Sequence, residues 1–261
     1  MTEPLNEETK TPLTIEQNIR RRTFISFSVF IAVNAAALGA WRWLRGSPEE
    51  APGVTAGAQQ PLRKALNKTE LATRQLFSPQ HLTKTYPKSR AAKEVRKNGD
   101  IGLKTSFVRA EWRLRVTRVS GQLMQVSIDE LKSLPKTEII YDFKCVEGWD
   151  QIQHWGGVKF MDFVNHFGLQ AEVQKQYLGL ETPDNEYYIG IDMESAMHPQ
   201  TILAYEMNDQ PLNAVHGAPL RLIVPVKYGI KNLKRIGNMN FSDQRPRDYW
   251  AEQGYDYYSG L

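Results

Sequence analysis

The feature that most constrains this chain is an uncharged run near its beginning. Residues 23–41 read TFISFSVFIAVNAAALGAW, 19 residues without a charged side chain. An apolar helix of about 20 residues is long enough to cross the hydrocarbon core of a bilayer. Arginines at positions 20–22 precede the run, and Trp41 and Trp43 mark its far end. By the positive-inside rule, this pattern predicts a single span, with residues 1–22 in the cytoplasm and the chain from about residue 46 outside it.

The arginines also allow a second interpretation. Arg21 and Arg22 are followed by one residue and then by Phe24 and Ile25, which resembles the core of a twin-arginine export signal. That route exports proteins that are already folded around a cofactor. Three arginines are equally sufficient as a topology signal, so we expect residues 23–44 to be an uncleaved transmembrane anchor or a twin-arginine signal.

The remainder of the chain is expected to form a linker and one domain. Residues 46–61 are rich in Gly, Pro, Ala and Gln without an apolar period, which is typical of a flexible linker, placed here at 45–64. At about 150 residues per domain, the rest of the chain amounts to one domain at 65–261. A composition of 41% apolar and 24% charged residues is that of a globular protein. The net charge of +4 is too small to indicate a nucleic-acid partner.

Short strands and short helices alternate along this domain. Apolar and polar residues alternate over 111–117, 136–145, 187–191 and 220–226, which predicts strands, with Ile140 directed inward. Ser127 and Glu130 have the spacing of a capping box and predict a helix within 126–134. A second apolar face at helical spacing covers 158–167. The mixture predicts an α+β fold.

The chain contains a single cysteine, Cys145. One cysteine excludes an intramolecular disulfide, a Cys-rich zinc site and an all-cysteine iron–sulfur cluster. Cys145 follows a predicted strand and precedes Gly148, where a side chain is readily presented to a cleft, and the adjacent Lys144 is expected to favour the thiolate. A buried structural residue, a nucleophile and a metal ligand all remain open for this side chain.

A basic cluster lies downstream of the cysteine. His216 and Arg221 offer hydrogen-bond donors, and Lys231, Lys234 and Arg235 add positive charge after a turn. Such a cluster can hold a phosphate or another anion, or it can form a solvated surface. The five histidines have no short paired spacing typical of a zinc site, and the Gly-rich phosphate loops of the common nucleotide-binding folds are absent.

Two segments of this sequence carry a resemblance to a known family. Residues 145–149 read CVEGW, and residues 198–204 read HPQTILA, followed by 208–211 and 216–234 in matching order and spacing. They resemble the signatures of the sulfite oxidase family of molybdopterin oxidoreductases. The resemblance covers about 65–261, and the export signal and the size of the chain point to the bacterial branch similar to the catalytic subunit of periplasmic protein-methionine-sulfoxide reductase. It implies the sulfite-oxidase-type molybdopterin-binding fold, with mixed sheets and short helices.

The resemblance also implies roles for individual residues. Cys145 would be the thiolate ligand of one molybdenum atom held by one pyranopterin (Mo-molybdopterin). Glu147 and Tyr228 would be catalytic partners near the metal. The residues that would contact the cofactor are Thr182, His216, Arg221, Asn232, Leu233 and Lys234.

The implied function is two-electron oxygen-atom transfer by an extracytoplasmic enzyme. Related reductases tend to have Asn at the position of His216, whereas sulfite oxidases tend to have His, so a small-molecule or protein sulfoxide and sulfite both remain as substrates. The resemblance does not extend to the haem-binding domain of full sulfite oxidases, so we expect a membrane cytochrome b or a soluble cytochrome c as electron partner. We expect a single-pass protein of the bacterial inner membrane with its catalytic domain in the periplasm. The rival hypotheses are a tethered, non-catalytic binding module and a metal-free thiol enzyme using Cys145.

Overall fold

The computed structural model of the protein describes residues 14–49, 59–74, 80–104, 108 and 110–261. Contacts divide the chain into two units, Met1–Pro48 with Gln59–Pro61, and Glu49–Ala58 with Leu62–Leu261. Each unit is described by itself. The first 13 residues of the predicted cytoplasmic segment, and 50–58 of the predicted linker, lie outside the described residues.

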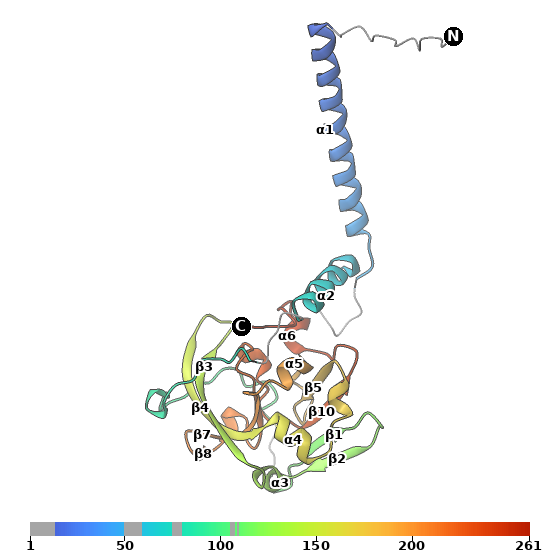
Figure 1. Cartoon of the computed structure of the whole chain (residues 1–261). Helices are drawn as coiled ribbons and strands as arrows, with labels where there is room; N and C mark the ends of the chain where they lie inside the picture. The colour runs from blue at the N-terminus through green and yellow to red at the C-terminus, as the bar shows by residue number, and fades with distance from the viewer. Residues whose placement is uncertain (1–13, 50–58, 75–79, 105–107, 109) are drawn as a thin grey trace, which may run out of the picture. The chain divides into compact units, whose positions relative to one another are not determined.

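The first unit contains one long helix, α1 (Ile15–Arg45) (Figure 1). It starts well before the apolar run because Thr14 and Gln17 form a capping box, and it ends at Gly46. The expected span 23–44 therefore lies inside a longer helix. Among the described residues, α1 is the one helix whose length and composition are sufficient to cross a membrane.

Helix α2 (Gln60–Arg74) corrects the predicted linker, which extended to residue 64. Pro61 occupies the first turn, where its fixed φ favours a helix and its missing N–H costs nothing. The next residues along the chain, such as Leu62, Lys64 and Ala65, are good helix formers. The linker therefore ends where α2 begins, at Gln60, and not at residue 64.

Two sheets form the domain, one mixed and one antiparallel, and the predicted α+β class is confirmed (Figure 1). One sheet has the order β2-β1-β10-β5-β6, with β1 and β10 parallel and the other pairs antiparallel. The other has the order β3-β4-β7-β8, with β9 also paired to β7. The strands are β1 (Leu114–Thr117), β2 (Leu123–Val126), β3 (Lys136–Lys144), β4 (Asp150–Lys159), β5 (Tyr177–Glu181), β6 (Tyr188–Asp192), β7 (Ile202–Met207), β8 (Gln210–Pro211), β9 (Arg221–Ile223) and β10 (Asn238–Ser242).

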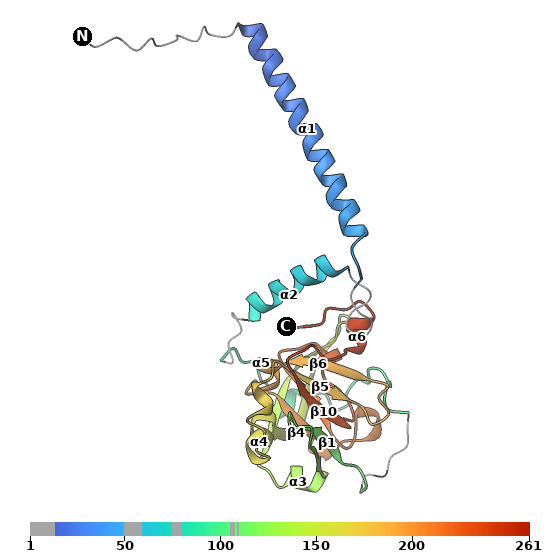
Figure 2. The ribbon, with the colours of Figure 1, turned by 90° about the vertical axis from the view of Figure 1, so that its right-hand side faces the viewer.

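The main core lies between these sheets. It combines Leu114 and Leu178 of the first sheet with Val158 and Leu203 of the second, all fully buried. Figure 2 shows β1, β10, β5 and β6 following one another across the first sheet. Burial of each such aliphatic side chain contributes about 1.5–3 kcal/mol to the stability of the fold. These contacts hold the two sheets against each other.

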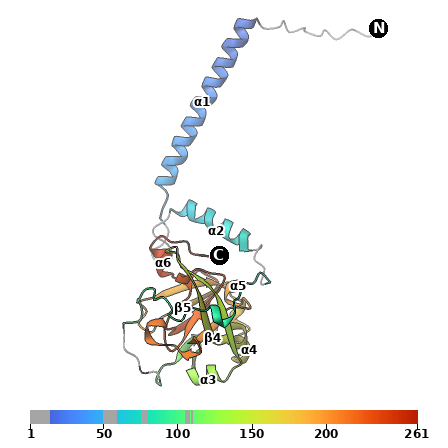
Figure 3. The ribbon, with the colours of Figure 1, turned by 90° about the vertical axis from the view of Figure 1, so that its left-hand side faces the viewer.

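Short helices connect the strands. Helix α3 has the predicted capping box of Ser127 and Glu130, and α4 follows β4 directly, as Figure 3 shows. Both helices confirm the sequence prediction within a few residues. The short helices are η1 (Lys88–Arg90), α3 (Ile128–Lys132), α4 (Phe160–His166), η2 (Glu172–Gln174), α5 (Met193–Ala196), η3 (Ala214–His216), η4 (Gly229–Lys231) and α6 (Tyr249–Glu252).

Two strand predictions require correction. In β3 the buried positions are Ile139, Tyr141 and Phe143, so the inward assignment of Ile140 was wrong by one residue. A shift of one residue exchanges the two faces of a strand. The predicted strand 220–226 is shorter, because β9 ends at Ile223, two residues before a proline that lacks a ladder donor.

Candidate active site

Cys145 begins the tight turn that joins β3 to β4. Its N–H donates to the carbonyl of Trp149 at 2.9 Å, and the N–H of Gly148 donates to the carbonyl of Cys145 at 3.1 Å. Gly148 has φ +84°, a left-handed conformation that a side chain would strain. The turn thus holds the thiol at a fixed place, where Cys145 is 6% exposed.

The environment of the thiol does not activate it as a nucleophile. Burial raises the pKa of Cys145, although a hydrogen bond from the backbone of Glu147 and the charge of Arg96 oppose this shift. The expected help from Lys144 is not found, because that side chain is exposed and lies 3.9 Å from Asp142. Reactive cysteines have a lowered pKa, so this site disfavours the metal-free thiol enzyme.

Glu147 is held beside the thiol by Trp149. The indole Nε1–H of Trp149 donates to Oε2 of Glu147 at 2.8 Å, and the same oxygen lies 3.8 Å from Sγ of Cys145. Trp149 stacks on Phe143 at 5.9 Å, and the guanidinium of Arg96 lies 4.6 Å from its ring centroid. A carboxylate is therefore fixed next to the thiol by a packed aromatic side chain.

The thiol faces a cavity of about 270 Å³, called here the thiol cavity. Its walls come from the β3–β4 turn, the loop before β1, the start of β6, the segment around η4 and the C-terminal segment. Four residues predicted for the site line it: Cys145, Glu147, Asn232 and Lys234. The other lining residues are Asn98, Gly99, Asp100, Ile101, Val146, Tyr187, Gly229, Ile230, Trp250 and Tyr255.

Loop 98–101 is fastened to the site by Lys234. The Nζ of Lys234 donates to the carbonyls of Asn98 and Gly99, the latter at 2.9 Å. Burial lowers the pKa of Lys234 to about 7, and the charge of Arg221 lowers it further, while Asp100 opposes the shift. The resemblance to the family places further pterin contacts in the stretch that includes Asn98, but the local match there is too poor to assign this loop to the site from the sequence.

Arg221 binds the backbone of the site and is not among the residues that line the thiol cavity. Its guanidinium donates to the carbonyls of His216 and Asn232, both at 3.2 Å, and lies 4.4 Å from the ring centroid of Trp155. Its Nε is buried without a hydrogen-bond partner among the described residues. Arg221 therefore fixes the backbone of two predicted cofactor contacts, and burial lowers its pKa to about 10.

His216 lies in a strongly cationic environment. Burial lowers its pKa to about 4, and the charges of Arg221, Lys234 and Lys97 lower it further. A second cavity, of about 420 Å³, borders the same region and shares Gly99 and Asp100 with the thiol cavity. Its other lining residues are Lys97, Leu103, Lys104, Ala214 and Val215. Several cations thus gather where an anion would relieve their repulsion.

Residues 102–250 match the family described as the oxidoreductase molybdopterin binding domain. The chain belongs to this family. It is an oxidoreductase, and its cofactor is molybdopterin, as the resemblance to the sulfite oxidase family implied.

Three relatives are similar to this chain over much of its length. One from Azospira oryzae, provisionally named protein-methionine-sulfoxide reductase subunit YedZ1, is 35% identical over 189 residues, 71% of this chain and 70% of that one. Two proteins named protein-methionine-sulfoxide reductase catalytic subunit MsrP are 29% and 32% identical, from Campylobacter jejuni and Xanthomonas campestris. They match 62% and 54% of this chain, which spans 60% and 48% of their own length.

One solved structure is also similar. The sulfane dehydrogenase SoxCD from Paracoccus pantotrophus gives a TM-score of 0.48 at 19% identity, over 54% of this chain and 40% of that one. That likeness is too low to bear on activity.

The residues of this molybdopterin-binding oxidoreductase fit its cofactor. A thiolate is a suitable ligand for a redox-active metal, and Cys145 is free and faces the thiol cavity. The cations around His216 suit the phosphate of a pterin cofactor. Cys145 lines the thiol cavity, and Lys97, one of the cations around His216, lines the second cavity. The two cavities are neighbours, because Gly99 and Asp100 line both.

Gly217 explains how the backbone after His216 approaches Lys234. It has φ +97°, and a Cβ at this position would lie 2.8 Å from Cα of Lys234. Only glycine accepts both the conformation and the close approach. This glycine keeps the predicted cofactor residues His216 and Lys234 adjacent.

Three predicted site residues are placed elsewhere. The hydroxyl of Thr182 is buried and donates to Asp184 at 2.6 Å, and the side chain of Leu233 lies in the core. Tyr228 is half-buried and is not among the described residues that line the thiol cavity. Leu233 can face a ligand only through its backbone.

Glu138, His154 and Asp209 form a group whose ligand atoms lie within 4.8 Å of one another. A lysine already neutralises it, because Nζ of Lys88 lies 2.8 Å from Glu138 and 2.9 Å from Asp209. The group is therefore explained by ion pairs without a metal.

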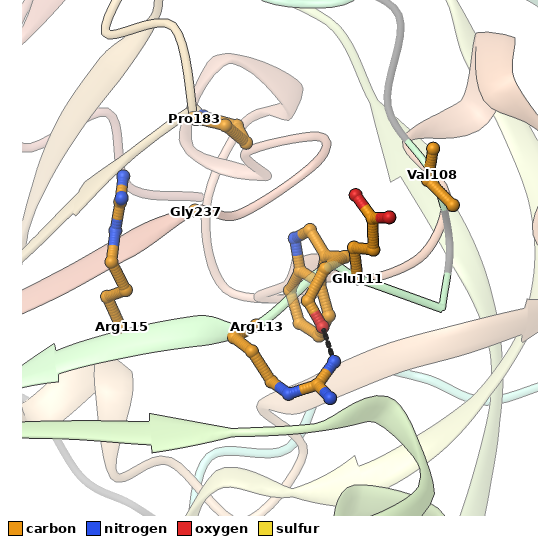
Figure 4. A pocket seen from close by; sticks show the side chains of 7 residues that line it. Val108, Glu111, Arg113, Arg115, Pro183 and Gly237 are labelled. Carbon is orange, nitrogen blue, oxygen red and sulfur yellow. Dashed lines mark hydrogen bonds between the residues drawn. The ribbon is translucent and has the colours of Figure 1, made fainter.

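A separate hollow of about 470 Å³ lies over β1 (Figure 4). Its lining includes Glu111, Arg113 and Arg115 but none of the residues around the thiol. Arg113 donates to the carbonyls of Ala110 and Trp112, both at 2.8 Å, so its guanidinium is committed to the backbone. We assign no ligand to this hollow.

Proposed function

We propose that this oxidoreductase reduces sulfoxides, with electrons from a separate protein. The reaction consumes two electrons and two protons and converts a sulfoxide into a thioether and water. The relatives named as protein-methionine-sulfoxide reductase subunits support this direction. When bound, the molybdenum cofactor supplies the two-electron redox change and accepts the oxygen atom.

The observation that carries the proposal is the charge of the thiol cavity. Glu147 and Asp100 line it, whereas the only lysine or arginine among its described lining residues, Lys234, already donates to two backbone carbonyls. A sulfite anion would lie near two carboxylates and a single lysine, whose ammonium has two backbone acceptors and would also serve the anionic part of the cofactor. A neutral sulfoxide carries no such penalty.

The chain's own residues take distinct parts in this proposal. Cys145 provides the thiolate that holds the metal. Glu147 holds or delivers a proton beside it, since its carboxylate is exposed to solvent and fixed by Trp149. His216 and Lys234 hold the anionic part of the cofactor, and Arg221 acts as a positioning residue through the backbone.

Three other predicted residues receive lesser parts. Asn232 accepts from the N–H of Val224 at 2.7 Å and donates to the carbonyl of Tyr228 at 3.1 Å, so it shapes the loop that faces the cofactor. Thr182 packs against Gly102 and fixes the loop before β1. We assign no catalytic role to Tyr228, because its side chain is not among those described around the cavity.

Sulfite oxidation is the second candidate, and His216 favours it. The resemblance implies His at this position in sulfite oxidases and Asn in the reductases. His216 is buried, however, and contributes to the cationic cofactor region, not to the lining of the thiol cavity. The choice between His and Asn at position 216 is therefore expected to affect binding of the cofactor more directly than binding of the substrate.

We also propose that α1 anchors the protein in the bacterial inner membrane, with the oxidoreductase domain in the periplasm. The arginines before the apolar run support this orientation, and Arg21 and Arg22 fit a twin-arginine signal. A membrane cytochrome b or a soluble cytochrome c would supply electrons. Protease accessibility of the domain in spheroplasts tests the orientation, and N-terminal sequencing of the membrane fraction tests whether the signal is cleaved.

The decisive experiment measures metal and turnover in the full chain. We expect about one molybdenum per chain, lost in Cys145→Ser, and reduction of methyl sulfoxides with a low-potential dye as electron donor. The same preparation is then offered sulfite with a dye acceptor. A molybdenum-loaded protein that oxidises sulfite and leaves sulfoxides untouched would overturn the proposal, and a metal-free protein would favour the binding-module hypothesis.

A further inference from the structure

The C-terminal segment supplies one wall of the thiol cavity. We propose that Trp250 and Tyr255 form the subsite for the side chain of a peptide-bound methionine sulfoxide. The inference rests on the proposed function, because it concerns the same cavity and the same substrate class.

The two rings form a continuous aromatic surface. Their centroids are 5.1 Å apart with an interplanar angle of 72°, and the N–H of Tyr255 donates to the carbonyl of Trp250 at 3.0 Å. Both residues line the cavity that contains Cys145, and Tyr255 is 44% exposed. The surface therefore leads from solvent to the thiol.

The wall is fixed by buried contacts. Asp248 caps α6 by accepting from the N–H of Ala251 at 3.0 Å, and its other oxygen pairs with Lys231. Both members of this ion pair are 1% exposed. Lys231 belongs to η4, whose first residues, Gly229 and Ile230, also line the cavity. The aromatic wall is thus attached to the segment that borders the cofactor region, and the buried ion pair holds it in place.

The chemistry of this wall suits a methyl sulfoxide. Methyl groups and sulfur pack favourably against aromatic rings, and the sulfoxide group carries no net charge. Free methionine sulfoxide carries an ammonium and a carboxylate that lose hydration beside the aromatic wall, whereas a peptide-bound residue has neutral amides in their place. The exposed edge at Tyr255 allows the peptide backbone to remain outside while the side chain enters. These features select a peptide-bound substrate over the free amino acid.

Steady-state kinetics of the cofactor-loaded full chain test the subsite. The substrates are N-acetyl-methionine sulfoxide amide, free methionine sulfoxide and dimethyl sulfoxide. For Trp250→Ala and Tyr255→Ala we expect KM for the blocked substrate to rise about tenfold with kcat changed less than about twofold. Trp250→Phe should recover most of the affinity, and Leu123→Ala, at an exposed position of β2, should match the wild type. For the wild type, kcat/KM should be higher for the blocked than for the free amino acid.

Binding of the thioether product gives a readout without turnover. Line broadening of the methyl resonance of N-acetyl-methionine amide should be seen with the wild type and be lost with both alanine variants. Unchanged KM and unchanged broadening in Tyr255→Ala, whose exposed ring can be removed without unfolding, would overturn the subsite. If the loaded wild type reduces none of the sulfoxides, the proposed function fails, while the broadening still reports on the wall. Preference for the free amino acid would overturn the selection of peptides.

Discussion

The indole of Trp149 and the carboxylate of Glu147 are joined by a hydrogen bond of 2.8 Å, which sets the carboxylate next to the Cys145 thiol. The pair lies in one five-residue turn, so the motif that contains the proposed metal ligand also contains the indole that orients the neighbouring carboxylate. This arrangement connects the cysteine motif to the chemistry of the site.

Removal of that hydrogen bond should slow turnover without loss of the metal. Trp149→Phe keeps a ring to stack on Phe143 but has no N–H donor for Glu147. A hydrogen bond to a charged group contributes about 1.5–3 kcal/mol, so we expect kcat to fall about tenfold or more. Metal analysis serves as the control, because a loss of molybdenum in Trp149→Phe would mean that Trp149 acts on the cofactor and not on Glu147.

Arg221 should contribute to stability through the carbonyls that it binds. Arg221→Met leaves the carbonyls of His216 and Asn232 buried without these donors, which should cost about 2–4 kcal/mol in the free energy of unfolding. Urea denaturation measures this loss. Arg115→Met, at an exposed arginine of β1, should change the same quantity by less than about 0.5 kcal/mol. Equal effects of the two substitutions would contradict the positioning role.

His216 should make the stability depend on acid pH. Its pKa in the folded protein is about 4, below the ordinary value of 6.5, so the unfolded chain binds the proton first. The stabilisation is complete above pH 6.5 and is lost as the pH falls toward 4, by up to about 3 kcal/mol. Denaturation from pH 7 to pH 4 should show a shallower fall in His216→Asn than in the wild type. His166→Asn, at an exposed position of α4, should keep the wild-type slope, and a slope that His216→Asn does not alter would refute this origin.

The ion pair between Lys231 and Asp248 should anchor the C-terminal segment. Asp248→Ala leaves the ammonium of Lys231 buried, with the carbonyl of Gly190 at 3.0 Å as its remaining hydrogen-bond acceptor among the described residues, at a cost of about 3–5 kcal/mol. Limited proteolysis should then cut the segment after β10 faster. Asp243→Ala removes an exposed partner of Lys175 and should cost less than about 1 kcal/mol. Equal protease resistance of Asp248→Ala and wild type would exclude the anchoring role.

Local patterns predicted the elements near the cysteine well. The capping box of Ser127 and Glu130 and the alternation that ends at Cys145 are set by neighbours in the sequence, and α3 and β3 follow them. Strand β4 had no comparable signal, because Gly156 and Gly157 and several polar residues interrupt its apolar pattern. Its pairing with β3 and β7 supplies the burial that the sequence pattern does not show.

The order of the basic residues in the sequence does not predict what each side chain contacts. Lys231, Lys234 and Arg221 looked alike in the sequence as candidates for an anion site. In the folded chain Lys231 pairs with Asp248, Lys234 faces the thiol cavity and Arg221 binds backbone carbonyls. Lys231 and Lys234 find their partners outside the basic cluster, in Asp248 and in the carbonyls of the loop before β1, whereas Arg221 binds backbone within the cluster.

The sequence by itself determined the family and the cofactor, and it singled out Cys145 as the proposed metal ligand, because a contiguous motif around Cys145 carries that information. Only the tertiary structure decided what surrounds the thiol. Asn98, Tyr187 and Trp250 come from distant parts of the chain and meet at one cavity. Hydrophobic periodicity and capping report on residues a few positions apart, whereas the wall of a cavity is set by long-range packing and by buried ion pairs that no local pattern records.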